Sequence, residues 1–306
     1  MRWLGQRAAD LRMRAEIWRK KRERRDVGCE IRRLQPEDYP AAAAVMACAP
    51  VETVLMRGRL ESAPSAHQHF LGEFDPAGEL CAVCWNGANI IPWGFDSAGI
   101  AALAQSLVSQ HVFANSLVGA AQQVLPLWRA IQPHFHAPRE VREHQLSMVW
   151  QGRPEPGVVP DSEVRYATEA DFDMVFPASV AMFIEEVGYD PSAQSASYRQ
   201  RARELIAQRF TFVRVGSDWR GHQRVEFKAD IGAFAGEVAQ IQGVWVHPEL
   251  RGRGLAAPAV LAVAEQIQRR LGATVHLYVN DFNAPAVRTY EKAGFTTVGE
   301  YATVML

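Results

Sequence analysis

A strand, a glycine-rich turn and an apolar helix follow one another in the second half of the chain. Residues 239–246 read as a strand, and the turn Arg251-Gly252-Arg253-Gly254-Leu255-Ala256 comes after them. Apolar residues that recur on one face predict a helix over 254–271. The first N–H groups of a helix have no partner within it, the helix dipole adds positive charge there, and glycine lets a phosphate approach the backbone. The segment therefore predicts an anion-binding site.

This turn does not match the two common nucleotide-binding motifs. It lacks the Gly-Lys-Ser/Thr of a Walker loop and the glycine spacing of a Rossmann fold. Taken alone, these six residues also fit a surface turn rich in arginine and glycine. The choice between the two interpretations depends on the segment that follows.

The segment 283–295 reads Asn-Ala-Pro-Ala-Val-Arg-Thr-Tyr-Glu-Lys-Ala-Gly-Phe and predicts a helix over 284–293. Asn283 is suited to the N-cap, Pro285 to the first turn, and Gly294 to the C-terminal stop. Tyr290 lies seven residues after Asn283, which is about two helical turns. The amide of Asn283 and the phenol of Tyr290 are therefore expected on the same side of this helix.

Together, the two segments resemble the Gcn5-related N-acetyltransferase (GNAT) superfamily. The first matches the Arg/Gln-x-x-Gly-x-Gly/Ala pyrophosphate loop, and the second matches an Asn-x-x-Ala-x-x-x-Tyr-x-x-x-Gly-Phe helix. The resemblance covers about residues 165–306, and the whole chain looks like a two-lobed actinobacterial subgroup whose first lobe is a domain of unknown function. The matching residues are Arg251, Gly254, Ala256, Asn283, Ala286, Tyr290, Gly294 and Phe295.

The resemblance implies acetyl-CoA as co-substrate, an amine as acceptor, and no metal. The backbone amides from Arg251 to Ala256 would hold the pyrophosphate. The strand end Val244-Trp245-Val246 would pair with the pantetheine arm and offer an amide to the thioester oxygen. Asn283 would help to fix the pantetheine, and Tyr290 would protonate the departing thiolate.

These residue types suit the direct attack of an amine on a thioester, without a covalent enzyme intermediate. A preorganised N–H stabilises the charge that builds on the carbonyl oxygen. A phenol with a pKa of about 10 is a reasonable proton donor to the thiolate. Pro258 departs from a regular helix start because it removes an N–H, which leaves open which amides face the phosphates.

The acceptor amine must lose a proton, so a base or a water chain is required. Glu185 and Glu186 close the helix predicted over 171–187, which in the superfamily usually borders the acceptor site. Neighbouring helix positions point in different directions, so at most one of the two is expected to face inward. The alternative interpretation is that both side chains are exposed to solvent and take no part in catalysis. Glu237 and Gln240 are rivals for the same role.

Four segments are expected along the chain. Residues 1–26 form a basic amphipathic helix, 27–150 a degenerate GNAT-like domain, 151–162 a proline-rich linker, and 163–306 the catalytic domain. The two lobes begin alike, since the strand and acidic turn of residues 29–38 return at 163–171. The predicted fold class is α/β (α+β), with tandem GNAT-like lobes that each hold a central mixed β-sheet flanked by helices.

The charges are concentrated at the start of the chain. The first 25 residues carry ten Arg and Lys residues against three acids, whereas the chain of 306 residues has a net charge of -1. Binding of nucleic acid by the whole body is therefore not expected. The arm has one apolar stripe, which fits docking on the body or on a second subunit in a homodimer. It also fits an anionic partner, such as RNA or a membrane surface.

Composition excludes several other classes. With 48% hydrophobic residues the chain can form a sizeable core, but no uncharged apolar run reaches the length of a transmembrane helix, and no signal peptide is predicted. Four cysteines do not make a disulfide framework, so a cytoplasmic location is expected.

Several weaker patterns have plain structural interpretations. Cys81 and Cys84 have redox-like spacing, but they lie in a predicted strand over 80–85 and are interpreted as buried packing. The histidines of 67–69 and 134–136 lack metal-ligand partners, and Trp219 is expected in a turn. Residues 118–121 read either as a relic of a phosphate turn or as a packed helix start. The first lobe lacks both family motifs.

The sequence thus predicts an acetyl-CoA-dependent N-acetyltransferase that acts on a primary amine of a small molecule, a protein lysine or a protein N-terminus. The active site is expected in the second lobe. The alternative is a catalytically silent acyl-CoA-binding regulatory module.

Overall fold

The computed structural model describes residues 30–62, 69–110, 114–191 and 196–306, so the predicted basic helix of residues 1–26 lies outside the described part. The first lobe contains β1 (Glu30–Arg33), η1 (Pro36–Asp38), α2 (Tyr39–Ala47), α3 (Pro50–Ser62), β2 (Phe70–Phe74), β3 (Leu80–Asn86), β4 (Asn89–Trp93), α4 (Ser97–Ser109), β5 (Ser116–Ala120), α5 (Ala121–Ile131), η3 (Gln132–His134) and β6 (Glu140–Trp150). The second lobe contains β7 (Arg165–Tyr166), η4 (Glu169–Asp171), α6 (Phe172–Val187), α7 (Ala196–Ala207), β8 (Thr211–Ser217), β9 (Gln223–Ala235), β10 (Val238–Val246), η6 (Pro248–Leu250), α8 (Ala256–Leu271), β11 (Thr274–Asn280), α9 (Ala284–Lys292) and β12 (Phe295–Met305).

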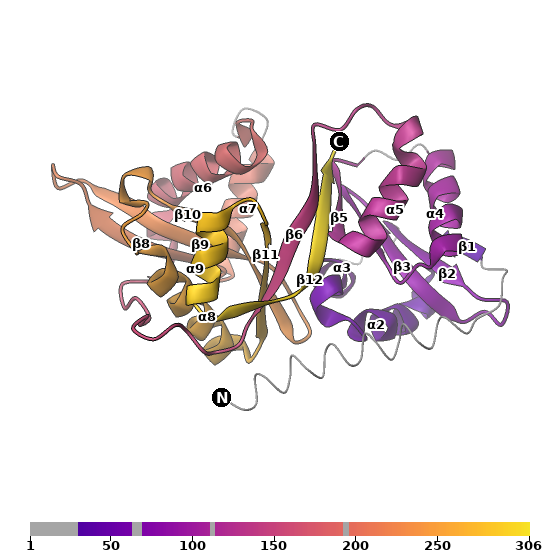
Figure 1. The fold of residues 1–306 in the computed structure, drawn as a ribbon, viewed down its shortest axis with the longest axis horizontal. Helices are drawn as coiled ribbons and strands as arrows, with labels where there is room; N and C mark the ends of the chain where they lie inside the picture. Colours follow the sequence, from indigo (N-terminus) through magenta and orange to yellow (C-terminus); the bar gives the residue numbers. More distant parts are fainter. Residues whose placement is uncertain (1–29, 63–68, 111–113, 192–195) are drawn as a thin grey trace.

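The predicted mixed α/β class with two lobes is confirmed, and the lobes share one sheet. Twelve strands follow the order β1-β2-β3-β4-β5-β12-β6-β11-β10-β9-β8-β7. The last strand of the chain, β12, lies antiparallel to β5 of the first lobe, while β6 lies antiparallel to β11 of the second. The lobes therefore exchange their final strands at the centre of the molecule (Figure 1).

Side chains of both lobes lock this exchange. Tyr301 of β12 is buried, stacks on Tyr278 of β11, and donates its hydroxyl to the carbonyl of Val51 in α3 at 3.0 Å. Val51 and Val54 of α3 also pack on Val238 of β10. Helix α3 of the first lobe therefore covers part of the second lobe's sheet.

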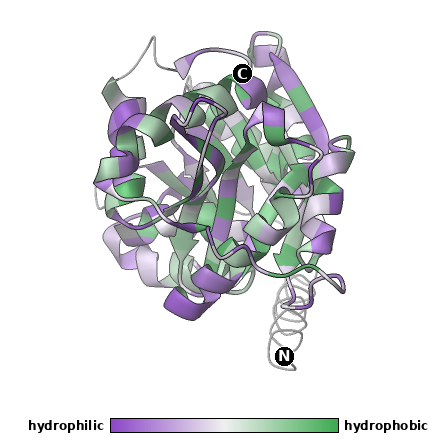
Figure 2. Ribbon diagram, turned by 90° about the vertical axis from the view of Figure 1, so that its left-hand side faces the viewer, coloured by the Kyte–Doolittle hydropathy of each residue, from purple (hydrophilic) through white to green (hydrophobic). Residues whose placement is uncertain are grey.

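Helices cover both faces of the sheet in each lobe, so many strand residues are buried on both faces. In β3, Val83 packs in the core under α2 and α3, whereas Cys84 packs in the core under α4 and α5. Cys81 and Cys84 are both buried, which confirms their interpretation as packing residues, and burial raises the pKa of the Cys84 thiol. Figure 2 shows hydrophobic residues gathered on the interior strands and hydrophilic ones on outer helix faces.

The repeat seen in the sequence is a repeated ion-pair clamp. Arg32 in β1 bonds both carboxylate oxygens of Asp38 at 2.6 and 3.0 Å, and Arg165 in β7 bonds both of Asp171 at 2.7 Å. Each aspartate also accepts a backbone N–H three residues before it, from Gln35 or from Thr168, at 2.7 Å. The two lobes thus begin with the same strand-to-helix corner, as expected of a duplicated fold.

Replacing Asp171 by asparagine is expected to lower the free energy of unfolding by about 1–3 kcal/mol at pH 7. The Arg165 guanidinium holds the pKa of the Asp171 carboxyl well below its usual range. A carboxylate with a lowered pKa stabilises the folded chain above its unfolded pKa of about 3.9, and this contribution is lost as the pH falls further. Urea unfolding should therefore separate variant and wild type at pH 7, and the difference should begin to narrow only as the pH falls below about 3.9.

Asp173→Asn is the matched control because Asp173 lies only two residues away and its side chain is 93% exposed. It should change the unfolding free energy by less than about 0.5 kcal/mol. An equal loss in both variants would show that the clamp at Asp171 has no special role.

Two local predictions have definite outcomes. Trp219 lies at the turn between β8 and β9, where its side chain is 84% exposed, as predicted. Residues 118–121 read either as a relic of a phosphate turn or as a packed helix start, but residues 118–120 end strand β5, whose pairing with β12 cannot be predicted from the local sequence. Among the described residues, no helix has the length and apolar content needed to cross a bilayer.

Candidate active site

A cavity of about 1230 Å³ opens where two parallel strands separate. Strands β10 and β11 are paired only from Val238 to Gln240 on β10 and from Thr274 to His276 on β11. Beyond this point the side of β10 that faces β11 has no strand partner, and residues 241–246 and 277–280 line the cavity. The opening thus exposes backbone N–H and C=O groups of β10 to a ligand.

The predicted glycine-rich turn lies at one end of this cavity. Gly252 and Gly254 have φ values of 74° and 81°, which favour glycine, and a Cβ at either would meet nothing within 4 Å. Helix α8 starts at Ala256, and its N-cap residue Leu255 makes no side-chain cap. Apart from Arg253, the residues of the turn line the cavity. Unpaired N–H groups of a helix start therefore face an open space, as an anion site requires.

Pro258 does not shift the start of helix α8. This residue is the third of α8, within the first turn, where N–H groups have no partner inside the helix. The helix therefore starts at Ala256 without a shift, and the amides before Pro258 remain available to a ligand.

Strand β10 carries a bulge beside the cavity. Gln242 pairs with Asp230 and Trp245 with Lys228, so Gly243 and Val244 together lie opposite one residue of β9. Gly243 has a φ of 60°, which few other residues adopt. The bulge breaks the regular ladder and turns the Gly243–Val244 peptide out of the sheet.

Helix α9 forms the wall opposite the bulge. Asn283 caps it by accepting the N–H of Ala286 at 3.3 Å, as predicted from the sequence. Both Asn283 and Tyr290 line the cavity, and the ring of Tyr290 packs edge-on against Phe295. Burial, with a smaller contribution from the charge of Glu186, raises the pKa of Tyr290 well above its usual value of 10. Its hydroxyl therefore keeps its proton at neutral pH.

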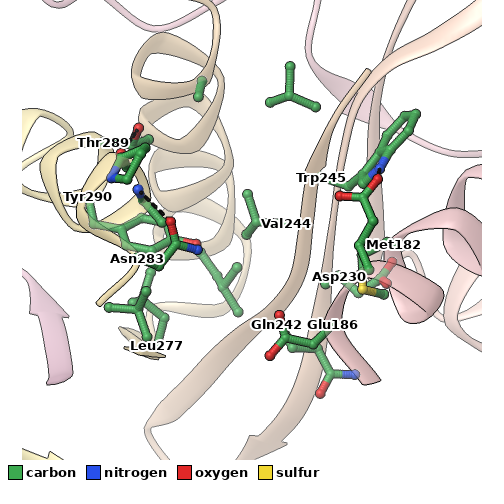
Figure 3. A pocket seen from close by; sticks show the side chains of 18 of the residues that line it. Met182, Glu186, Asp230, Gln242, Val244, Trp245, Leu277, Asn283, Thr289 and Tyr290 are labelled. Carbon is green, nitrogen blue, oxygen red and sulfur yellow. Dashed lines mark hydrogen bonds between the residues drawn. The ribbon is translucent and has the colours of Figure 1, made fainter. Parts of the chain in front are cut away.

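Glu185 and Glu186 both line the cavity, but they have different partners. Glu185 accepts two hydrogen bonds from Arg251 at 2.7 and 2.9 Å and one from the indole of Trp245 at 3.2 Å. It thus ties the end of α6 to the glycine-rich turn. Glu186 accepts a hydrogen bond through Oε1 from Arg142. In Figure 3, Glu186 lies across Val244 from Asn283 and Tyr290.

Sequence reasoning missed Arg142, which lies on the exchanged strand β6. Its side chain is 8% exposed and bonds Glu140 at 2.9 Å as well as the side chain and carbonyl of Glu186. The first lobe thus contributes to this site. A strand that precedes the linker supplies the residue that holds Glu186.

The two rivals proposed for the base lie elsewhere. Glu237 lies in the turn between β9 and β10, and the buried Gln240 pairs with His276 where the strands are still joined. Neither residue lines the cavity. Strand order places both at the closed end of the splay, so the expectation that either acts at the site was wrong.

Two parallel strands of the first lobe also separate, but a side chain fills the gap between them. Strands β4 and β5 pair in parallel over only two residues. Gln123 then bonds both the N–H and the C=O of Phe95 at 2.9 Å each, which fills the opening. At the start of α4, Asp96 caps the N–H of Gly99 at 2.8 Å, and a Cβ on Gly99 would lie 2.4 Å from the carboxylate of the buried Glu73.

Two carboxylates therefore occupy the helix start that corresponds to the open one in the second lobe. Residues 118–121 are the end of β5 and the start of α5. The turn that corresponds to the glycine-rich turn of the second lobe is instead the one between β4 and α4. Asp96 and Glu73 at the start of α4 would repel a phosphate. This agrees with the absence of the anion-site motif from the first lobe.

The histidine pairs form no metal centre in the described ranges. His69 contacts the carbonyl of Asn86 at 3.1 Å, and His134 and His136 are exposed, while His67 lies outside the described residues. No group of three or more His, Cys, Asp or Glu side chains suited to a metal occurs in the described part of the chain.

Comparisons with known sequences match two successive segments of the chain. The acetyltransferase (GNAT) family model matches residues 185–295, and a domain of unknown function, DUF4081, matches residues 69–175. An acetyltransferase of Agrobacterium fabrum is 38% identical over 72 residues, which is 22% of this chain and 51% of that protein. A mycothiol acetyltransferase of Mycobacterium avium is 42% identical over 67 residues, 20% of this chain and 21% of that protein. The chain thus aligns with about half of the first relative and a fifth of the second.

Solved structures share the two-lobed fold at low sequence identity. A GCN5-related N-acetyltransferase from Sphaerobacter thermophilus aligns over 90% of this chain and 94% of its own, with a TM-score of 0.58 and 18% identity. A tandem GNAT protein from the clavulanic acid biosynthesis pathway aligns over 91% of this chain and 98% of its own, with a TM-score of 0.55 and 16% identity. The second lobe thus carries a GNAT acetyltransferase domain over residues 185–295, which form much of the open cavity, behind a DUF4081 domain over residues 69–175.

Proposed function

We propose that the chain is an acetyl-CoA-dependent N-acetyltransferase that passes the acetyl group directly from the thioester to a primary amine. The observation that carries this proposal is the open splay between β10 and β11. It places an uncapped helix start at one end of a cavity and Tyr290 in its wall, opposite the bulge at Val244.

The donor set of the cavity fits acetyl-CoA. The backbone amides of the turn from Arg251 to Ala256 would bind the pyrophosphate, because the first N–H groups of α8 have no partner inside the helix and positive φ at two glycines opens the approach. Within this turn the N–H of Arg251 already donates to the carbonyl of Pro248 at 3.3 Å. The side of Val244, Trp245 and Val246 that has no strand partner would bond the pantetheine amides as a strand does, although the carbonyl of Val246 already accepts from Nε of Arg251 at 3.0 Å. The side-chain NH₂ of Asn283 would add a donor, since its oxygen already caps α9.

Within this arrangement an amide of β10 stabilises the negative charge on the thioester oxygen, and Tyr290 protonates the departing thiolate. Tyr290 suits this role because burial raises its pKa, so that the proton is present when the thiolate forms. The co-substrate supplies the activated acyl group, and the protein supplies position, hydrogen bonds and the proton.

Glu186 is the better placed of the two predicted bases. Glu185 uses both oxygens on Arg251, whereas Glu186 uses Oε1 on Arg142, and among the described residues Oε2 has no hydrogen-bond partner. Glu186 lies on the side of Val244 away from Tyr290 (Figure 3), and we place the attacking amine on that side, opposite the acid that serves the leaving thiolate. It would accept the ammonium proton directly or through a water molecule, while Glu185 would hold the turn in place.

Thiol release from acetyl-CoA tests the proposal, with pools of small amines and basic peptides as acceptors. We expect release that depends on an acceptor, and a mass spectrum of the acetylated product would identify it and separate a metabolite from a protein acceptor. Saturable binding of acetyl-CoA without turnover on any amine would instead favour a regulatory acyl-CoA-binding module. Absence of binding would contradict both functions.

A further inference from the structure

A charged side chain is completely buried next to the proposed acyl site. Lys228 of β9 is 0% exposed, and its ammonium lies 2.6 Å from the carboxylate of Asp230, which is 8% exposed. Thr211 of β8 donates to the other oxygen of Asp230 at 2.8 Å. Removing two charges from water is costly, and an apolar pair of similar volume often gives equal or greater stability. The position of this pair therefore needs an explanation other than stability.

The pair lies directly beneath the bulge of β10. A Cβ built on Gly243 would lie 3.1 Å from the carboxylate of Asp230 and 3.5 Å from the ammonium of Lys228. The ammonium also lies 3.5 Å from the carbonyl oxygen of Gly243, a long contact in which charge and dipole attract each other. The bulge thus rests on the ion pair, with its carbonyl directed toward the positive charge.

The direction of this carbonyl fixes the direction of the next N–H. In a trans peptide the C=O of one residue and the N–H of the following residue point in opposite directions. The N–H of Val244 therefore points away from Lys228. Figure 3 shows Val244 between Asn283 and Tyr290 on one side and Asp230 and Glu186 on the other.

We propose that Lys228 is a positioning residue for acyl transfer, which holds and polarises the Gly243–Val244 peptide so that the Val244 N–H binds the thioester oxygen. The inference rests on the proposed function and deepens it, because it selects one amide of residues 244–246 as the donor. A positive charge on a peptide oxygen draws electron density from the N–H at its other end and strengthens that donor. A rigid donor that needs no reorganisation is what stabilises a developing oxyanion.

The test uses a ketone analogue of acetyl-CoA, in which a methylene separates the sulfur from a ¹³C-labelled carbonyl, so that no transfer occurs. In wild type, isotope-edited infrared spectra should show the bound carbonyl band at lower frequency than in free ligand, because a strong donor weakens the C=O bond. The Lys228→Met/Asp230→Asn variant removes both charges. Its band should return most of the way toward the free-ligand position, and its kcat should fall about tenfold or more with KM for acetyl-CoA within about threefold.

Two further variants separate this role from a general loss of stability. Asp171→Asn breaks the ion pair with Arg165, remote from the bulge, and should lower stability without moving the carbonyl band. Lys228→Arg keeps the charge and should hold the band near its wild-type position. If the Met/Asn variant does not fold, Lys228→Gln/Asp230→Asn provides a second charge-free pair whose amides can bond each other.

The infrared measurement keeps this inference separate from the proposed function, because it needs no acceptor and no turnover. A wild-type band that does not shift on binding would overturn the assignment of the Val244 amide. A shifted band that persists in a folded charge-free variant would overturn the role of Lys228, even if acetyl transfer is observed. Absence of turnover with a shift that depends on Lys228 would contradict the enzyme and leave the positioning intact.

Discussion

Replacing Tyr290 by phenylalanine is expected to lower kcat for acetyl transfer by about a hundredfold or more, with the Kd for acetyl-CoA changed by less than about threefold. The variant keeps the ring that packs on Phe295 and removes only the hydroxyl. Without this donor the thiolate must leave unprotonated or take its proton from water. Thiol release with a saturating acceptor measures kcat, and calorimetric titration measures the affinity.

The raised pKa of Tyr290 also sets the expected pH dependence. An acid that keeps its proton well above pH 10 does not limit the rate on the alkaline side between about pH 7 and 9. Deprotonation of the acceptor should instead make the rate rise with pH across this interval. A fall in this range that disappears in Tyr290→Phe would contradict a raised pKa.

Tyr301→Phe is the matched control for loss of a buried tyrosine hydroxyl. Tyr301 bonds the carbonyl of Val51 away from the cavity lining, so its variant should lose about 1 kcal/mol of stability and keep its kcat. Equal losses of kcat in the two variants would indicate a structural effect and not proton transfer.

Placing an aspartate at Ala256 is expected to weaken acetyl-CoA binding about a hundredfold or more while slightly stabilising the fold. Ala256 is the first residue of α8 and lines the cavity at the uncapped helix start. A carboxylate there satisfies the helix N–H groups and dipole, which stabilises by about 0.3–1 kcal/mol, but it competes with the pyrophosphate for the same donors and repels it. Thermal unfolding and calorimetric binding measure the two opposite effects.

Ser97→Asp provides the matched control because Ser97 is exposed and is the first residue of α4, the corresponding helix of the first lobe. Asp96 and Glu73 already place acids at that helix start. The control should therefore leave acetyl-CoA binding unchanged. Loss of binding in Ser97→Asp would show that the first lobe contributes to the site.

The sequence predicted the elements of the second lobe well because the residues that define them lie close together in the chain. The N-cap at Asn283, the stop at Gly294 and the apolar face of α8 each depend on residues within a few turns of one another. The same is true of the corner that begins each lobe, where Arg165 and Asp171 are six residues apart. Contacts of this kind can be predicted from the spacing of residue types along the sequence. The family resemblance then assigned functional roles to the residues that make them.

The exchange of β6 and β12 could not be predicted in this way. The partners of β6 are β11 and β12, each more than a hundred residues away, and nothing in residues 140–150 predicts either pairing. The contact of Arg142 with Glu186 depends on this exchange, so the sequence alone gave no reason to connect them. The burial of Lys228 was equally hidden, because a charged residue in a strand is ordinarily exposed. Asp230 lies two residues away on the same strand, but Gly243 meets Lys228 only once β9 and β10 pair.

The stoichiometry of acetyl-CoA binding tests most directly the claim that the open splay of the second lobe is the acyl-CoA site. Calorimetric titration of the full chain should give one molecule bound per chain for wild type and for Ser97→Asp, and no saturable binding for Ala256→Asp at the same ligand concentrations. Two molecules per chain, or unchanged binding by a folded Ala256→Asp variant, would contradict it.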